Sequence, residues 1–189
     1  LRVAVPYTGM IISTRESKEC REKVLELARL LAPYQGHILV HIVPFTDLQL
    51  AIYEHCEESY AITIMRRMMY RIAERLAQKQ NCLAIVNGES IGQVASQTLE
   101  SMHTINAVTS MPIIRPVATM DKVEIIDLAR KVGTYETSIQ PWEDCCTIFT
   151  PKNPVTKPTI RRAEGLERRF DFETLLEACV EQTESVHVY

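Results

Sequence analysis

Two short apolar runs on either side of one long amphipathic segment constrain the fold of this chain most strongly. The runs are ILVHIV (residues 38–43) and CLAIVNGES (residues 82–90), in which leucine, isoleucine and valine are prominent. Runs of this length and composition are typical of strands that are buried in a parallel sheet. The intervening residues 60–80 have the periodicity of a helix. This strand–helix–strand order predicts an α/β domain.

The rest of the chain continues this alternation. A strand is predicted at residues 112–117, followed by a helix. Asp121 is the predicted N-cap of this helix and forms a capping box with Glu124, and Gly133 ends the helix. Further elements are predicted at residues 3–6 (a strand) and at 17–32, 47–57, within 91–102, 161–169 and 172–182 (helices). We therefore expect an α/β fold of three layers with a mainly parallel sheet, in which ligands bind at the carboxyl ends of strands.

Composition limits the class of protein. The chain has 189 residues, 46% hydrophobic and 24% charged, which is ordinary for a globular protein of one or at most two domains. Because the net charge is -3, any RNA contact must be local. The six cysteines show no metal-type C-x-x-C spacing. In a chain of this size they do not indicate a secreted disulfide scaffold, which favours a reducing cytoplasm. No apolar run approaches about 18 residues, so no membrane span is predicted.

The turn after the second apolar run carries the first candidate site. Gly88 allows a sharp turn or the close approach of a ligand to the backbone. Hydrogen-bonding groups in the segment after it suit a nucleotide or a sugar. The alternative is an ordinary strand–turn–helix junction in which Gly88 is only a turn residue. The polar and small residues of this segment are Glu89, Ser90, Gly92, Gln93, Ser96 and Gln97.

Adjacent cysteines in EDCCTIFTPKNPVTKP form the second candidate site. Cys145 and Cys146 lie in a predicted loop between Asp144 and two lysines, Lys152 and Lys157. Nearby cations lower the pKa of a thiol, and the resulting thiolate serves as a nucleophile or accepts sulfur. The alternative is that both cysteines are ordinary small loop residues.

The helix at residues 60–80 carries four arginines in two different settings. At about 100° per residue, Arg66 lies on the apolar side. A guanidinium there needs a partner, so Arg66 either extends its head to solvent or binds a ligand. Arg67, Arg71 and Arg75 lie on the opposite side, where we expect a solvated face paired with Glu74 and its neighbours. The apolar side is formed by Ile62, Met65, Met69, Ile72, Ala73 and Leu76.

No spacing of residues supports a metal centre. His41 lies within an apolar strand, where a satisfied core histidine is the simpler interpretation, and His103 has no partner at a zinc-ligand spacing. The sequence also contains no nucleophile elbow and no complete Walker loop.

Four long motifs, in order along the chain, resemble the catalytic domain of the tRNA 4-thiouridine synthetase family, ThiI. They are SYAITIMRRMMYRIAERLA, GESIGQVASQTLESMHTI, PIIRPVATMDKVEIIDLARKVGTYETSI and EDCCTIFTPKNPVTKP. The similarity runs from about Glu22 to the C-terminus. It implies an adenine-nucleotide α-hydrolase-like (PP-loop) domain that uses ATP and Mg²⁺, and Arg66, Gly88 and Gln97 fall where the family contacts ATP.

The resemblance also implies an activity. In this family a tRNA uridine is adenylated, and a persulfide sulfur supplied by a cysteine desulfurase then displaces AMP to give 4-thiouridine. The family is also linked to sulfur supply for the thiazole of thiamine, and a homodimer is expected. Cys146 matches the sulfur-handling cysteine because CTIF follows the family pattern of Cys, a small residue and two apolar residues, with Cys145 as the alternative.

Some parts of the family pattern are not found in residues 1–189. The phosphate-binding Ser-Gly-Gly-x-Asp-Ser loop, the THUMP region and the rhodanese domain of some members are missing, and the residues before Lys18 do not align. We therefore expect one catalytic domain, a fragment that binds nucleotide weakly and does not turn over. Two alternatives are another PP-loop tRNA thiolase or amide ligase, and a non-catalytic domain that binds tRNA or a partner.

Overall fold

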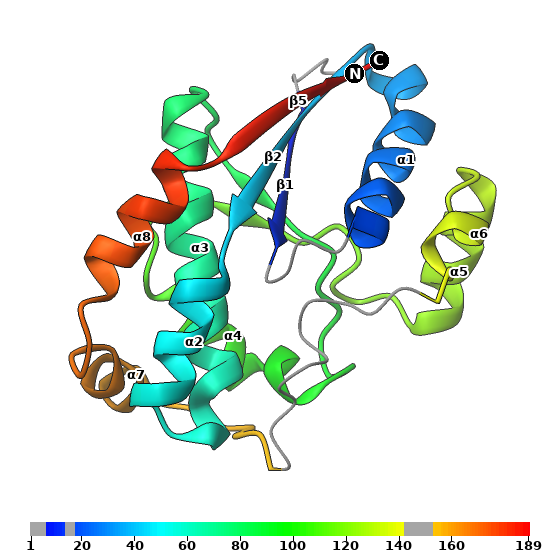
Figure 1. The fold of residues 1–189 in the computed structure, drawn as a ribbon. Coiled ribbons are helices and arrows are strands. Elements are labelled where there is room, and N and C mark those ends of the chain that lie inside the picture. Colours follow the sequence, from blue (N-terminus) through cyan, green and yellow to red (C-terminus); the bar gives the residue numbers. More distant parts are fainter. Residues whose placement is uncertain (1–6, 14–17, 142–152) are drawn as a thin grey trace.

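The computed structural model describes residues 7–13, 18–141 and 153–189, and strands alternate with helices along them (Figure 1). The strands are β1 (Tyr7–Ser13), β2 (Ile38–Pro44), β3 (Ile85–Val86), β4 (Ile113–Ile114) and β5 (Glu184–Val188). The helices are α1 (Lys18–Gln35), α2 (Thr46–His55), α3 (Ala61–Lys79), α4 (Leu99–Asn106), α5 (Lys122–Lys131), α6 (Tyr135–Ser138), α7 (Ile160–Glu167) and α8 (Phe172–Glu181). Short 3-10 segments, η1 (Glu58–Tyr60) and η2 (Ala95–Gln97), precede α3 and α4.

The described strands form two sheets. β1 and β2 are parallel, with Tyr7 opposite Ile38, and β5 is antiparallel to β2, with Val188 opposite the same Ile38. β3 and β4 are parallel, with Ile85 opposite Ile113. Most of the described pairings are therefore parallel, as the sequence predicted.

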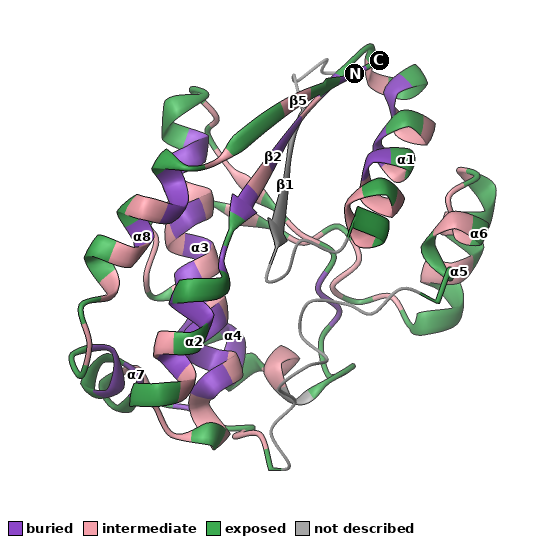
Figure 2. Ribbon diagram, viewed as in Figure 1, coloured by how far each residue is buried: buried purple, intermediate pink, exposed green. Residues whose placement is uncertain are grey.

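Helices cover both sides of the strands, which confirms the three-layer α/β fold. In Figure 1, α1, α5 and α6 lie on one side of β1 and β2, and α2, α3 and α8 lie on the other. The main hydrophobic core is in the second layer, where side chains of α2, α3, α7 and α8 pack together below the end of β2. Figure 2 shows the buried residues gathered on α2, α3 and α8, while α5 and α6 carry none.

Two glycines end helices by adopting a left-handed backbone. Gly133 has φ of 81° after α5, and Asp121 and Glu124 form the predicted capping box at the other end of that helix. Gly36, with φ of 90°, ends α1 and donates its N–H to the Ala32 carbonyl. The predicted end of this helix before Pro33 is wrong, because α1 continues through Pro33 to Gln35.

Strand ends were predicted less well than helices. β1 and β5 were not predicted, and the strand predicted at residues 3–6 lies outside the described residues. The predicted strands at 82–87 and 112–117 pair only over Ile85–Val86 and Ile113–Ile114. The helix predicted within 91–102 begins at Leu99, where Thr98 caps it by accepting the Ser101 N–H.

Candidate functional site

The arginine side of α3 is not a solvated face, and the prediction for Arg67 is wrong. Arg67 is only 1% exposed. Its Nε and Nη2 atoms donate to the two carboxylate oxygens of Glu167 on α7, at 2.7 and 3.0 Å, and its Nη1 donates to the Thr104 carbonyl on α4 at 2.6 Å. This bidentate ion pair satisfies the buried guanidinium.

Arg71 and Arg75 pair with glutamates of α7 and α8 rather than with Glu74, the partner that the sequence suggested. Arg71 donates to both oxygens of Glu167 at 2.8 and 2.9 Å and lies 4.8 Å from the centre of the Phe172 ring. Arg75 pairs with Glu173 on α8. The helical wheel failed here because it assumes one core side, whereas α3 packs against α2 and α8 and also against α4 and α7.

The pKa of Glu167 reflects this double pairing. Burial by itself would raise the pKa of the carboxyl, but hydrogen bonds from Arg71 and Arg67 outweigh burial and hold that pKa below its ordinary value. Glu167 is therefore a carboxylate in the folded protein at neutral pH. It joins α3 to α7 and contacts none of the residues predicted to bind ATP.

Arg66 has its partner within the chain. Its guanidinium forms an ion pair with Glu89, and its Nη1 donates to the Ser96 carbonyl at 2.6 Å. The side chain is largely buried, with 17% exposed. The two contacts lie beside two of the other predicted residues, because Glu89 follows Gly88 and Ser96 precedes Gln97. Arg66 thus joins the segments that carry Gly88 and Gln97.

Glu89 is the centre of a polar network. It is 5% exposed and accepts hydrogen bonds from Tyr70 Oη at 3.2 Å, Asn87 Nδ2 at 2.8 Å and Arg115 Nε at 2.6 Å. Arg115 also donates to Asn106 on α4 at 2.8 Å. The network therefore joins α3, the end of β3, the end of β4 and α4, and it lies at the carboxyl ends of two parallel strands.

The backbone at Gly88 is open to a ligand. A Cβ atom built there would meet no atom within 4 Å, and Gly88 does not have a left-handed φ. Neither the backbone conformation nor the packing of the described residues requires a glycine at this position, in contrast to Gly133. Gly165 within α7 is equally open and also lacks a left-handed φ, so this geometry alone does not choose between a turn residue and the close approach of a ligand.

Gln97 ends the η2 segment, and its backbone is fixed. Its carbonyl accepts the Gly92 N–H at 2.9 Å, which closes the loop that follows Gly88. Ser90 Oγ donates to the Met120 carbonyl at 2.7 Å and ties the same loop to the segment before α5. The loop that carries two of the three predicted ATP contacts is therefore anchored at several points.

The network has an excess of positive charge. Two guanidiniums, Arg66 and Arg115, contact one carboxylate, Glu89. Two cations against one anion favour an anionic ligand beside them.

Several of these residues were missed from the sequence. Asn87 and Arg115 each directly follow one of the paired strands, so the rule that ligands bind after strand ends could have found both. Glu89 was noted there as one of several polar residues, without a role. Tyr70 gave no signal in the sequence that separates it from core residues of α3.

The cysteine pair, Cys145 and Cys146, lies outside the described residues. Among the described cysteines, Cys56 and Cys179 are poor nucleophiles, because burial raises the pKa of each thiol to about 11. Cys20 and Cys82 are partly exposed.

Metal ligands do not cluster in the described residues, where no group of three or more His, Cys, Asp or Glu side chains is placed to hold an ion. His41 is buried, as predicted, with its Nδ1 2.8 Å from Ser185 Oγ, but its buried Nε2 has no hydrogen-bond partner among the described residues, so this histidine is only partly satisfied. None of the described helices combines the length and apolar character needed to span a membrane.

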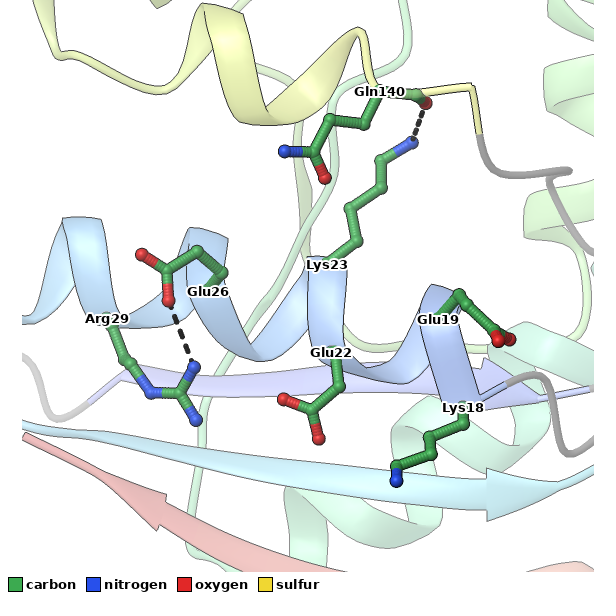
Figure 3. A pocket seen from close by; sticks show the side chains of 7 residues that line it. All are labelled: Lys18, Glu19, Glu22, Lys23, Glu26, Arg29 and Gln140. Carbon is green, nitrogen blue, oxygen red and sulfur yellow. Dashed lines mark hydrogen bonds and ion pairs between the residues drawn. The ribbon is translucent and has the colours of Figure 1, made fainter.

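A pocket on α1 shares no residue with the network around Glu89. It is lined by six charged side chains of α1 and by Gln140 (Figure 3). The charges of both signs partly satisfy one another, as in the pair of Arg29 with Glu26 at 3.0 Å, and Lys23 donates to the Gln140 carbonyl at 3.3 Å. The pocket contains none of the predicted site residues.

An α/β fold with a cationic network at the carboxyl ends of parallel strands is the arrangement of a nucleotide-binding α/β protein. The family model described as Thiamine biosynthesis protein (ThiI) matches residues 3–172, so the prediction that the residues before Lys18 do not align with the family is wrong. The chain belongs to this family.

Individual relatives agree with this assignment. The chain is 54% identical over 183 residues to the "Probable tRNA sulfurtransferase" of Bacillus pumilus (strain SAFR-032), covering 97% of this chain and 44% of that protein. It is 55% identical over 168 residues to the "Probable tRNA sulfurtransferase" of Brevibacillus brevis (strain 47 / JCM 6285 / NBRC 100599), covering 89% and 42%. The chain thus spans less than half the length of these curated relatives.

A solved structure confirms the fold. The "Crystal structure of a 4-thiouridine synthetase - RNA complex with bound ATP" matches with a TM-score of 0.90 and 37% identity, over 97% of this chain and 48% of that one. The predicted PP-loop ThiI fold is therefore shown for this chain.

Proposed function

We propose that this chain is the catalytic domain of an ATP-dependent tRNA sulfurtransferase. In the proposed reaction the C4 oxygen of a tRNA uridine attacks the α-phosphate of ATP, and pyrophosphate leaves. The terminal sulfur of a persulfide then attacks C4, and AMP leaves with the former C4 oxygen. A second thiol attacks the inner sulfur of the resulting disulfide, which releases the thiolated uridine and leaves a disulfide that a thiol reductant must reduce before the next cycle. The product is 4-thiouridine. The names of the similar tRNA sulfurtransferases support this proposal, as do the ATP and RNA bound in the similar 4-thiouridine synthetase structure.

The observation that carries the proposal is the pair of contacts made by Arg66. Arg66 contacts Glu89 and Ser96, the neighbours of Gly88 and Gln97, so a residue of α3 lies against the loop that carries the other two. In our proposal Arg66 contributes a cation to ATP, Gly88 lets the backbone approach the nucleotide, and Gln97 offers its amide.

Mg²⁺ has no protein ligand set in the described residues. In this proposal the ion reaches the site with the ATP phosphates, which are its preferred partners in nucleotide-dependent enzymes.

Sulfur transfer in this proposal belongs to Cys146, with Cys145 as the alternative. Cys56 and Cys179 are poorer candidates, because burial raises the pKa of each thiol to about 11. A thiol that carries sulfur must form a thiolate near neutral pH.

The proposed partners follow from the same reaction. tRNA is the substrate, a cysteine desulfurase supplies the persulfide, and a homodimer in the cytoplasm is the expected form. The same sulfur would also serve synthesis of the thiamine thiazole.

Measurement of 4-thiouridine in tRNA from cells that lack the gene, with and without complementation, tests this function. We expect 4-thiouridine to disappear in the deletion strain and to return with the gene. If another thiolated nucleoside disappears instead, the protein is a different PP-loop thiolase. If no nucleoside changes, the amide-ligase and non-catalytic alternatives gain support.

A further inference from the structure

Glu89 is a buried carboxylate to which the proposed function gives no role. We infer that Glu89 is a positioning residue that holds Arg66 in place for nucleotide binding. This inference rests on the proposed function, since it assumes that Arg66 contacts ATP.

The two oxygens of Glu89 have different partners. Oε2 accepts hydrogen bonds from Tyr70, Asn87 and Arg115, and this fixes the carboxylate from three directions. Oε1 faces Nη2 of Arg66. An arginine side chain has many rotamers, so an anchored carboxylate at its head restricts it to one placement.

The charges in the network support the same role. Arg66 and Arg115 both contact Glu89, so removing the carboxylate charge would leave two guanidiniums beside each other without an anion between them. Of these two arginines, Arg66 contacts the residues next to Gly88 and Gln97. We therefore expect Arg66 to move away from its present position when Glu89 is neutralised.

Glu89 acts through Arg66 and not on the nucleotide itself. It is 5% exposed, and both oxygens face protein donors. A carboxylate in direct contact with phosphates would also repel them.

Glu167, the last residue of α7, provides a matched control. It is equally buried at 3% exposed, and it is also paired with two arginines of α3, Arg67 and Arg71. Its ion pairs, however, connect α3 with α7 and do not involve the loop of Gly88. If both glutamates are only structural, their glutamine variants should lose stability alike and keep their ATP affinity. If Glu89 also positions Arg66 for ATP, only Glu89→Gln should lose ATP affinity.

A double-mutant cycle on the full chain separates these roles. The affinity for ATP in the presence of Mg²⁺ is measured by calorimetry, and by NMR titration where binding is weak, for the wild type, Glu89→Gln, Arg66→Ala, the double variant and Glu167→Gln. We expect Glu89→Gln to weaken ATP binding about tenfold, in the range of coupling between contacting residues. The double variant should bind no more weakly than Arg66→Ala alone.

Glu167→Gln should lower the Tm and leave ATP affinity within about twofold of the wild type. If Glu89→Gln does not fold, Glu89→Asp takes its place in the cycle, because it keeps the charge but shortens the reach to Arg66.

Different failures of the experiment are distinguishable. Additive losses in the double variant would show that Glu89 acts independently of Arg66 and would overturn the inference alone. An unchanged affinity in Arg66→Ala would remove the ATP contact on which the inference rests. If the wild type binds no ATP, the inference fails because Arg66 then makes no nucleotide contact in this chain. The proposed function is tested separately by 4-thiouridine in the complementation experiment.

Discussion

At the residue scale, Gly88 is informative because nothing in the described part of the protein requires it. Gly133, which follows α5, has a left-handed φ, so an alanine there would be strained. Gly88 has no such φ and faces open space. In our proposal, a ligand that approaches the backbone accounts for the absence of a side chain.

Replacement of Gly88 by alanine should therefore affect binding more than stability. We expect Gly88→Ala to keep or slightly raise the free energy of unfolding, because alanine reduces the entropy of the unfolded chain. ATP affinity should fall, as measured by titration. Gly133→Ala is the control: it should cost about 1 kcal/mol of stability and leave ATP affinity unchanged. Normal ATP binding by Gly88→Ala would contradict the proposed approach.

The two adjacent cysteines differ in their predicted roles. We expect Cys146→Ala to abolish formation of 4-thiouridine in a complementation assay and to leave ATP affinity intact, because the thiol takes part only in sulfur transfer. Cys145→Ala is the matched control and should retain activity. Loss of activity in Cys145→Ala alone would reverse the assignment within the pair.

At the element scale, α3 shows how far sequence periodicity extends. The helix itself and its amphipathic character were predicted, and α5 was predicted with both of its caps. Arg67 was misplaced because a wheel cannot show that a second layer of helices covers the polar side. That layer includes α7, about 100 residues further along the chain, and no local pattern identifies it.

The pairing of Glu167 with α3 predicts a pH-dependent stability. The pKa of Glu167 lies below its ordinary value of 4.5 in the folded protein. Its contribution to the free energy of unfolding is therefore complete above that ordinary value and is lost as the pH falls through the folded pKa.

Glu167→Gln should cost about 3 kcal/mol at pH 7, because Arg67 then stays buried without a carboxylate. The difference from the wild type, measured by urea unfolding, should shrink as the pH falls below 4.5. The exposed pair of Arg75 with Glu173 is the control, and Glu173→Gln should cost at most about 1 kcal/mol. An equal cost for both variants at every pH would argue against this account.

At the scale of the whole molecule, the sheet that holds β1, β2 and β5 was only partly predictable. β2 was predicted because its residues are apolar and branched. β5 has the sequence ESVHV, in which exposed and buried positions are mixed, and it becomes a strand by pairing with the edge of β2. The site likewise depends on contacts between distant segments: its segments follow strand ends, but the pairing of Arg66 with Glu89 has no sequence pattern.

Val188 should contribute to stability through this pairing. It is 5% exposed and packs with Ile38 and Val40 in the smaller hydrophobic cluster beside α1. Val188→Ala should lower the free energy of unfolding by about 2 kcal/mol, from lost apolar burial and an unfilled space. The neighbouring Tyr189 is 82% exposed, so Tyr189→Ala should change stability little in the same chemical denaturation experiment. Equal effects would indicate that β5 does not stabilise the sheet.

The anchoring of Arg66 has a consequence for the thermodynamics of binding. A free arginine side chain carries about 2 kcal/mol of rotamer entropy, and a ligand that orders it must lose part of its affinity to that cost. Here Glu89 and the Ser96 carbonyl order the side chain when the chain folds. The side-chain entropy of Arg66 is therefore lost when the chain folds and not when a ligand binds. In our proposal, this leaves a larger part of the interaction free energy between Arg66 and an anionic ligand as binding affinity.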